Sequence, residues 1–217
     1  NGLTSSAHPS LYDLKKGRLR LYARVNKGIV KSDTAKYLTG GITSREKMYV
    51  RYGKVEARVR VHGAQGTWPA IWMSRNKRVG YPKYAELDLM ELLNHNTYVY
   101  QTVHNNWVDK LKMKTPAYQV KADINPENYN VYAVEILPNE IIFSVNGKET
   151  LHYPKIQTDQ EGQFPYGEDN MFVMLDMQVG GAWVKTVDPK QFPAYMDIDW
   201  VRMYEYEGER QLFHIGN

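Results

Sequence analysis

The sequence predicts an all-β fold, an antiparallel β-sandwich or jelly roll, and three observations lead to this prediction. Several segments alternate apolar and polar residues with a period of two, turn-forming residues separate these segments, and we find no amphipathic helix of three turns. Strands of this kind bury their apolar faces when two antiparallel sheets pack face to face. With 217 residues, the chain is long enough for one hydrophobic core, so we expect a single domain over residues 1–217.

The alternation is clearest in the segments 17–25 and 54–61. In the second segment Val55, Ala57, Val59 and Val61 alternate with charged residues, which places one face of the strand in a core and the other in solvent. We expect the basic residues on such outward faces to be solvated and to protect sheet edges. Apolar content and flanking turns predict six further strands, in the segments 85–93, 98–104, 129–137, 141–145, 171–178 and 198–206.

Turn signals support these boundaries. Asn146 and Gly147 separate the segment 141–145 from the polar run 148–152, and both residues tolerate the positive φ of a two-residue hairpin. Proline cannot donate a hydrogen bond to a sheet, so we expect five prolines to fall between strands. These are Pro126, Pro138, Pro154, Pro165 and Pro189.

Composition excludes several classes of function. The chain has no cysteine, which rules out disulfides, thiolate zinc sites and cysteine nucleophiles. Its 28 Lys and Arg against 24 Asp and Glu give a net charge of +4, and the positive residues are scattered over alternating strand faces, so we expect no nucleic-acid partner. No apolar run approaches the ~20 residues that cross a membrane. The 17 Tyr and 5 Trp suit stacking on sugar rings as well as filling a sheet core.

The segment 85–93 carries the candidate chemistry, because Glu86, Asp88 and Glu91 interrupt an otherwise apolar run. In a regular strand Glu86 and Asp88 point to one face and Glu91 to the other. A β-bulge between Leu89 and Glu91 adds the one residue that returns Glu91 to the face of Glu86, and bulges are common beside active sites. An acidic edge or a calcium-binding strand is the alternative interpretation of the three carboxylates, and the leucines around them disfavour an exposed edge.

Two glutamates placed in this way suit a retaining glycosidase. With the bulge they stand roughly 13 Å apart at Cα, and side chains that lean toward each other can reach the roughly 5–5.5 Å between carboxyl groups that a double displacement needs. One carboxylate attacks the anomeric carbon while the other protonates the leaving oxygen and then activates water. Asp88, between them, makes ionisation of its neighbours more costly, which helps one group to keep its proton near neutral pH.

The run Glu-Leu-Asp-Leu-Met-Glu of residues 86–91 resembles the bulged ExDxxE signature of glycoside hydrolase family 16, which contains laminarinases, agarases, porphyranases and related endo-galactosidases. Four other segments resemble the family in the same order, 66–73, 101–104, 178–183 and 198–202, and the likeness covers nearly the whole chain. The resemblance implies a retaining endo-β-glycosidase with a concave jelly-roll cleft. It also implies Glu86 as the nucleophile, Asp88 as its hydrogen-bonded assistant and Glu91 as the general acid/base.

The resemblance further implies which residues lie near the sugar. These are Trp68 or Trp72, His104, Gln178 and Trp183, with Trp107 as a further candidate. Trp183 follows two glycines, which suits a stacking platform on a loop. A structural role is the alternative for some of them, because Trp68 and Trp72 share strand parity and can belong to the core, and a strand histidine such as His104 often forms buried hydrogen bonds.

The sequence departs from the family pattern in two places. Relatives begin with an additional N-terminal strand, which we expect this chain to lack. In the family that strand contributes to a structural calcium site on the convex face, together with the aspartate that matches Asp199, so a structural calcium is an option here and no cofactor is expected for catalysis. Many β-glucan-cleaving relatives also have tryptophan where this chain has Tyr81, and often glycine where it has Ala85.

The loop 74–83 holds four positive charges in ten residues and leads into the acidic strand. If this loop lines the cleft, Arg75 or Arg78 can hold a sulfate through paired charge-assisted hydrogen bonds, with Tyr81 stacking nearby. A solvated loop is the alternative. We therefore expect a β-galactan substrate such as porphyran, agar or a host-glycan galactoside, ahead of a β-1,3 or mixed-linkage glucan.

Cellular location and the competing functional classes follow from the same observations. The chain begins at Asn1, so either an export signal has been removed or the sequence starts inside a longer protein, and we expect a secreted, periplasmic or cell-surface monomer.

Two other functional classes compete with the enzyme. A non-catalytic, lectin-like sugar-binding module is the second class, because lectins also use jelly rolls and aromatic platforms. A basic nucleic-acid binder is the third, and it would require an affinity that falls steeply with salt.

Overall fold

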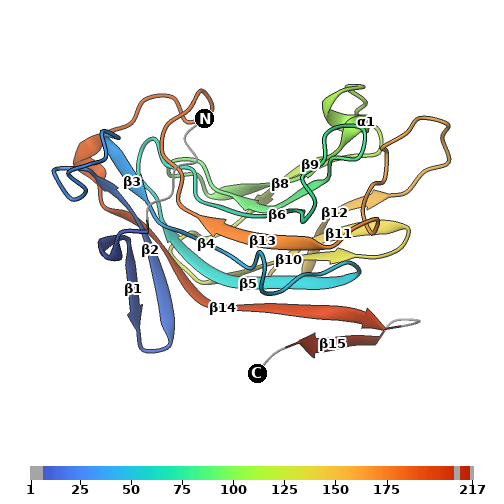
Figure 1. Cartoon of the computed structure of the whole chain (residues 1–217), viewed down its shortest axis with the longest axis horizontal. Coiled ribbons are helices and arrows are strands. Elements are labelled where there is room, and N and C mark those ends of the chain that lie inside the picture. Colours follow the sequence, from blue (N-terminus) through green and yellow to red (C-terminus); the bar gives the residue numbers. More distant parts are fainter. Residues whose placement is uncertain (1–6, 208–210, 216–217) are drawn as a thin grey trace.

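The computed structural model describes residues 7–207 and 211–215, which form two antiparallel sheets packed face to face (Figure 1). In spatial order the main strands of the larger, nine-stranded sheet are β1 (Tyr12–Lys15), β2 (Arg18–Val25), β14 (Ala194–Glu207), β5 (Gly53–His62), β10 (Asn130–Ile136), β11 (Glu140–Val145) and β12 (Lys148–Pro154). Two short strands complete it, β3 (Tyr37–Thr39) on β2 and β15 (Gln211–Ile215) on β14.

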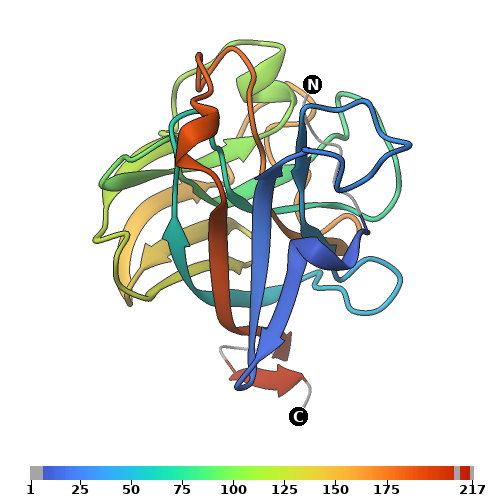
Figure 2. The same ribbon diagram turned by 90° about the vertical axis from the view of Figure 1, so that its left-hand side faces the viewer.

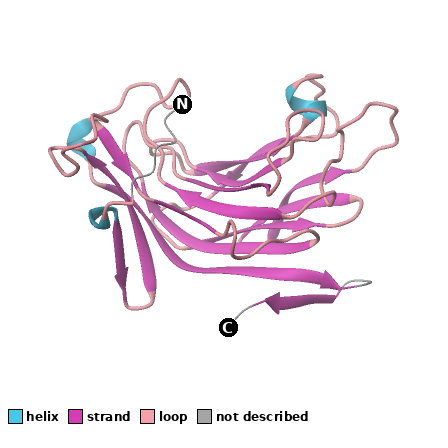
Figure 3. Ribbon diagram, viewed as in Figure 1, coloured by secondary structure: helices cyan, strands magenta, loops and turns pink. Residues whose placement is uncertain are grey.

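The smaller sheet of the described residues has six strands. In spatial order they are β4 (Gly41–Thr43), β13 (Met171–Asp176), β6 (Ala70–Arg75), β7 (Glu86–Glu91), β8 (Tyr98–His104) and β9 (Gln119–Asp123). Helix within the described residues is limited to three short turns in loops, η1 (Pro9–Leu11), α1 (Asn106–Asp109) and η2 (Pro189–Gln191) (Figure 3). The predicted all-β jelly-roll sandwich is confirmed.

The core lies between the two sheets and is built from the alternating apolar residues. Val55, Ala57 and Val59 of β5 are fully buried, as the period-two pattern predicted. Tyr132 and Phe143 are among the largest fully buried side chains. Burial of apolar surface stabilises the fold by ~25 cal/mol per Å², so large aromatic side chains contribute most to such a core.

In the described part of the chain no helix is long and apolar enough to cross a membrane.

All eight predicted strands are present, with ends that differ by a few residues. The strands that the sequence analysis did not predict are β1, β3, β4, β6, β9 and β15. Most of them have only three to five residues, too few to show a period. In β6 the apolar residues Ile71, Trp72 and Met73 are consecutive, so this strand shows no alternation although it lies inside the sheet.

The Asn146-Gly147 hairpin is confirmed, and one proline lies elsewhere than predicted. Asn146 and Gly147 have φ angles of 52° and 80°, and Val145 pairs with Lys148 across the turn. Pro154 is not between strands but is the last residue of β12, where it pairs with Glu140. Because β12 is an edge strand, one side of it has no neighbour that needs a donor from proline.

The smaller sheet has one face on the core and the other open, and the open face carries the candidate site. In Figure 1 this sheet lies above the larger one, and loops rise at both of its ends, α1 and the connection 155–170 at one end and the connection 177–193 at the other. The perpendicular view shows β2 and β14 side by side in the opposite, larger sheet, in agreement with their pairing (Figure 2). Residues of the smaller sheet therefore line a concave surface between two walls of loops.

Candidate active site

The acidic strand β7 contains the predicted bulge. Asp88 pairs with Thr102 of β8 and Glu91 pairs with Tyr100, so three steps along β7 face two steps along β8. The pairing of β7 with β6 shifts at the same place. The two residues between Asp88 and Glu91 are both fully buried in the core. The extra residue therefore returns Glu91 to the concave face that already carries Asp88.

Gln101 of β8 holds this bulge from the core side. Its side chain is fully buried, and its amide donates to the main-chain carbonyl of Leu89 at 2.9 Å. Leu89 is one of the residues that the bulge leaves without a partner in β8. The amide oxygen of Gln101 accepts a hydrogen bond from Thr150 of β12, in the opposite sheet. A buried amide or carbonyl without a partner costs about 1–3 kcal/mol, so these contacts stabilise the bulge and link it to both sheets.

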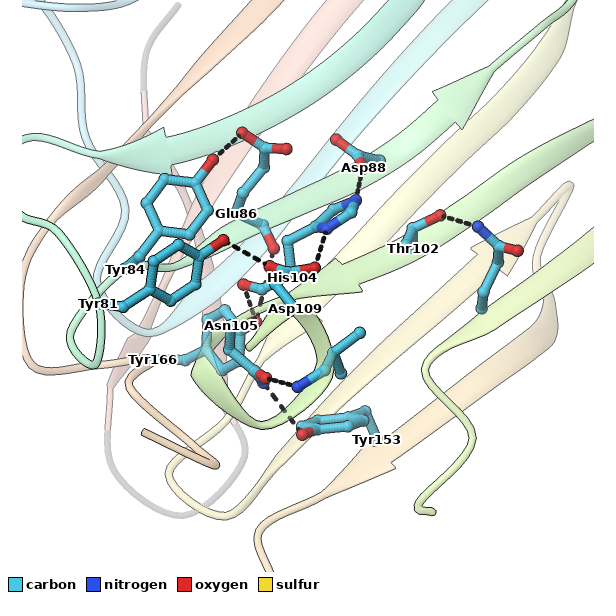
Figure 4. Close-up of polar contacts among 12 residues, drawn as sticks. Tyr81, Tyr84, Glu86, Asp88, Thr102, His104, Asn105, Asp109, Tyr153 and Tyr166 are labelled. Carbon is cyan, nitrogen blue, oxygen red and sulfur yellow. Dashed lines mark hydrogen bonds and ion pairs between the residues drawn. The ribbon is translucent and has the colours of Figure 1, made fainter. Parts of the chain in front are cut away.

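Each of the two glutamates accepts a hydrogen bond from an aromatic side chain. The Tyr84 hydroxyl donates to Glu86 Oε2 at 2.5 Å (Figure 4). The Trp68 indole N–H donates to Glu91 Oε1 at 3.0 Å. Because Tyr84 precedes β7 and Trp68 precedes β6, loops at both ends of the sheet fix the orientation of the carboxyl groups.

A chain of hydrogen bonds connects Asp88 to the loop before β7 (Figure 4). His104 of β8 contacts Asp88 Oδ2 through Nε2 at 3.1 Å and Asp109 Oδ1 through Nδ1 at 2.9 Å. The Tyr81 hydroxyl donates to the other oxygen of Asp109 at 2.9 Å. Burial opposes a charge on His104, but the hydrogen bonds to Asp109 and Asp88 outweigh it and raise the pKa of His104 to about 11. His104 is thus a cation that donates from both ring nitrogens.

The carboxyl groups of the site bind protons more tightly than free carboxylic acids do. Burial, followed by repulsion from Asp88, raises the pKa of Glu86 to about 7 and that of Glu91 to about 8. Burial also raises the pKa of Asp88, against the effect of its hydrogen bond from His104. As the pH rises, Glu86 therefore loses its proton before Glu91 does, and the two groups differ in charge near neutral pH.

Trp72 and Gln178 come together on Asp176, a residue that the sequence analysis did not single out. The Trp72 indole N–H donates to Asp176 Oδ2 at 3.3 Å, and the Gln178 amide donates to Oδ1 at 3.0 Å. Burial raises the pKa of Asp176 to about 6. Trp72 pairs in register with Asp88 and lines the cavity beside Glu86, so it belongs to the concave face rather than to the core.

A row of aromatic rings extends from Glu91. The Trp68 ring, whose indole binds Glu91, lies edge-on to Trp183 with 5.0 Å between centroids. Trp183 is 38% exposed and also contacts Tyr100 of β8, at 4.8 Å between centroids. Trp68 and Trp183 therefore lie together beside Glu91, on the loops before β6 and after β13.

A cavity of about 420 Å³ lies beside Glu86, at the other end of the acidic strand. Its lining includes the positively charged residues Arg45, Lys77 and Arg78. Arg75 also lines it, but its guanidinium donates to the Lys83 carbonyl at 2.5 Å and to Glu168 at 3.2 Å. Arg75 therefore anchors the loop rather than presenting a free guanidinium, whereas Arg78 takes part in no ion pair among the described residues.

Of two further aromatic residues that were predicted for the site, Trp107 is buried and Tyr81 contacts the acidic cluster. Trp107 is only 7% exposed, and its indole donates to the Thr115 carbonyl at 2.9 Å. It fixes the loop after α1 and presents no ring face to the concave surface. Tyr81 is 37% exposed, but its hydroxyl is bound to Asp109 and its ring lies 5.1 Å from that of Tyr84, so it is part of the hydrogen-bonded edge of the acidic cluster.

The surroundings of Asp199 do not fit the calcium ion that the resemblance implied. Arg18 donates to one carboxylate oxygen at 3.2 Å, and Arg58 forms a salt bridge with the other. Calcium takes six to eight oxygen ligands, whereas this carboxylate is already neutralised by two guanidinium groups. Asp197, two residues earlier, lies in the same way between Arg20 and Arg60.

The acidic cluster is better suited to proton transfer than to binding a metal. Ligand atoms of Glu86, Asp88 and His104 lie within 4.8 Å of one another, the only such group of three among the described residues. A metal ligand must be deprotonated, but His104 donates a proton from each ring nitrogen and has a pKa of about 11.

Four residues of the site were missed by the sequence analysis. For two of them strand parity was an available signal, because Tyr84 precedes Glu86 by two positions and Asp176 precedes Gln178 by two. Gln101 belongs to one of the matched segments, but nothing in the sequence relates it to Leu89. Asp109 is the last residue of α1, and only the folded chain brings it to His104.

Comparison with known proteins agrees with this geometry. The family model described as glycosyl hydrolases family 16 matches residues 13–202. The keratan-sulfate endo-1,4-beta-galactosidase of Sphingobacterium multivorum is 33% identical over 85% of this chain, and the beta-glucanase of Rhodothermus marinus is 30% identical over 78%. The chain spans 44% and 63% of the length of these two relatives. The X-ray structure of the laminarinase from Rhodothermus marinus superimposes with a TM-score of 0.81 and 26% identity, over 93% of this chain and 82% of that one.

The link between Gln101 and the bulge predicts the effect of replacing Gln101 by leucine. Gln101→Leu removes the donor to Leu89, so the free energy of unfolding should fall by about 1–3 kcal/mol. Amide hydrogen exchange at Met90 and Glu91 should accelerate by more than the global loss of stability explains. Denaturant unfolding and native-state exchange measure the two effects.

A buried amide of the larger sheet provides the control for this substitution. Asn130 donates to the carbonyls of Asn125 and Asn128, in the connection between β9 and β10. Asn130→Leu should lower stability without a local acceleration at Glu91. The same exchange pattern in both variants would mean that Gln101 has no particular role at the bulge.

Proposed function

Because this chain belongs to glycosyl hydrolases family 16, we propose that it is a retaining endo-β-glycosidase that cleaves internal bonds of a sulfated β-galactan. The observation that carries this proposal is the bulged face of β7, on which Glu86, Asp88 and Glu91 lie together. The ordered pKa values of the two glutamates support the roles of a nucleophile that is ionised and an acid that is protonated.

In the first step the ionised Glu86 attacks the anomeric carbon, and Glu91 donates its proton to the glycosidic oxygen as the leaving group departs. In the second step Glu91 takes a proton from water, which attacks the glycosyl-enzyme ester and releases Glu86. The indole of Trp68 and the hydroxyl of Tyr84 orient the two carboxyl groups for these roles. The configuration at the anomeric carbon is retained.

Asp88 and His104 adjust the charge at each step. The negative charge of Asp88 keeps the pKa of Glu91 high while Glu91 acts as an acid. The charge of Glu86 raises the pKa of Glu91 in the free enzyme, and formation of the ester removes this charge. The pKa of Glu91 therefore falls in the intermediate, and Glu91, which has given its proton to the leaving group, stays ionised and ready to accept a proton from water. The positively charged His104, held between Asp88 and Asp109, limits the total negative charge of the cluster.

The positive charge beside Glu86 supports a sulfated substrate. Arg45, Lys77 and Arg78 line the cavity there, and a free guanidinium such as that of Arg78 can bind a sulfate with two hydrogen bonds. The relative named for keratan sulfate and β-galactosidase activity supports a galactan in particular. A polymer of this kind is met outside the cytoplasm, so we place the enzyme at the cell surface, in the periplasm or in the medium, acting as a monomer.

An endo-β-1,3(4)-glucanase is the second candidate. The relative named beta-glucanase and the laminarinase structure favour it, and the rings of Trp68, Trp183 and Tyr100 would stack on glucose as well as on galactose. A sugar-binding module without activity is the third, and it differs from both enzymes because it releases no reducing ends.

Removing either glutamate should abolish hydrolysis and preserve binding. We expect Glu86→Gln and Glu91→Gln each to reduce the release of reducing ends by about 10⁴-fold or more, with oligosaccharide affinity retained in titration calorimetry. Azide should restore part of the activity of Glu91→Gln toward an aryl glycoside with a good leaving group, which needs no acid. Glu149→Gln, at an exposed position of β12, is the matched control. Wild-type rates in Glu86→Gln would contradict the role given to Glu86, whereas a wild-type protein that binds sugars and releases no reducing ends would leave only the sugar-binding module.

The two raised pKa values predict a bell-shaped dependence of kcat/KM on pH. Activity should rise as Glu86 ionises, with a pKa of about 7, and fall as Glu91 loses its proton, with a pKa of about 8. The maximum is therefore expected between pH 7 and 8. Asp88→Asn removes a negative charge that raises both values, so the residual activity should have its maximum at lower pH. An unshifted maximum in this variant would contradict the role given to Asp88.

Digestion of keratan sulfate, porphyran, agarose and laminarin, with detection of reducing ends, tests the substrate class. We expect the sulfated galactans to be cleaved, and Arg78→Gln to lower kcat/KM on them by about tenfold, since a charge-assisted hydrogen bond contributes ~1.5 kcal/mol. Chemically desulfated galactan should show no such loss. Arg202→Gln, exposed on β14, is the control. Degradation of laminarin with every galactan resistant would favour the glucanase instead.

A further inference from the structure

A second positive charge lies on the concave face, on the side of the acidic strand away from Arg78. In the smaller sheet, β8 and β9 follow β7 on one side, and β6, β13 and β4 follow it on the other. The cavity with Arg45 and Arg78 belongs to the second side, because most of its lining residues come from β6, β13 and the loops after β4 and β6. On the first side, the edge strand β9 carries Lys121.

Lys121 is exposed and is held over two aromatic rings. It pairs in register with Tyr100, and its ammonium lies 4.7 Å from the ring centroid of Tyr98 and 5.4 Å from that of Tyr100. Among the described residues no ion pair involves Lys121. Hydrogen bonding to Tyr100 raises its pKa, so the ammonium is charged throughout the neutral range. Its charge is therefore available to an anion from outside.

The rings beneath Lys121 continue to the catalytic residues. Tyr98 contacts Tyr100 at 5.6 Å between centroids, Tyr100 contacts Trp183, and Trp183 contacts Trp68, which donates to Glu91. This aromatic row, Tyr98-Tyr100-Trp183-Trp68, leads from the general acid to the edge of the sheet. Rings in such a row can bind the apolar faces of sugar units, and the ammonium at its end adds a contact that selects for charge.

We propose that Lys121, Tyr98 and Tyr100 form a subsite for a sulfated sugar unit on the β9 side of the cleaved bond. The proposal rests on the function proposed above and extends it, because the sulfate site at Arg78 lies on the opposite side of β7. The substrate is then a β-galactan that carries sulfate groups on both sides of the bond that is cut. Such a chain crosses the sheet from the cavity at Arg78 to the edge strand β9.

A structural role for Lys121 makes a different prediction. Lysines on edge strands protect sheets from pairing with other chains, and any polar residue of similar size fulfils this role regardless of the substrate. A subsite, in contrast, requires the charge and responds to the charge of the ligand. Because the ammonium is already held over the rings, little side-chain freedom remains to be lost when a sulfate binds.

The test compares Lys121→Gln and Lys121→Arg on keratan sulfate and on the same polymer after chemical desulfation. We expect Lys121→Gln to raise KM for the sulfated polymer about fivefold, which corresponds to ~1 kcal/mol, with kcat unchanged. KM for the desulfated polymer should stay within about twofold, and Lys121→Arg should behave as the wild type. Lys148→Gln, at an exposed position of β12 in the larger sheet, is the matched control. Tyr100→Ala should raise KM for both polymers, since stacking does not depend on sulfate.

The outcomes separate this subsite from the proposed function. If Lys121→Gln changes KM equally for both polymers, or for neither, the subsite is overturned. The proposed function is unaffected by this result, because the wild type remains an active galactanase. If the wild type cleaves neither keratan sulfate nor any other galactan of the substrate panel, the proposed function fails. Titration of sulfated keratan oligosaccharides into the Glu86→Gln protein then tests the subsite by itself. A loss of affinity on adding Lys121→Gln would then support the subsite, and an unchanged or undetectable affinity would overturn it.

Discussion

The geometry of the site depends on one additional residue in β7. Without it, the alternation of the strand would turn Glu91 toward the core, where a carboxylate has no compensating partner. With it, Leu89 and Met90 both enter the core and Glu91 leaves it. The strand loses regular pairing at this point, and the buried amide of Gln101 replaces it with a hydrogen bond to Leu89 and a connection to the opposite sheet. Core packing and active-site geometry are therefore fixed together.

The charge of the acidic cluster is set by residues outside β7. Burial alone would raise the pKa of every carboxyl group, and the cluster would then hold too many protons to provide a nucleophile. His104 on β8 supplies the opposing positive charge, and Asp109, oriented by Tyr81, keeps His104 protonated. Loops that approach from the rim thus control the protonation of side chains at the centre of the sheet.

The sequence predicted those features that depend on local periodicity. Clear alternation located two strands, and apolar content between turn signals located six more. Asn146-Gly147 located the hairpin, and the parity of Glu86 and Glu91 required the bulge. The features that it did not predict depend on contacts between distant segments. The guanidinium of Arg75 is occupied by Glu168, 93 residues away, and nothing in the local sequence indicates this. Strand β6, which shows no alternation, and the burial of Trp107 likewise depend on neighbours in the fold.

The larger sheet is held together on its outer face by alternating guanidinium and carboxylate groups. Asp197 and Asp199 of β14 lie between arginines of β2 and β5, so side chains connect three neighbouring strands at the place where the family resemblance suggested an ion. A protein that uses its own arginines at this point does not depend on calcium to hold these three strands together, and this part of its fold can persist where little of the metal is free.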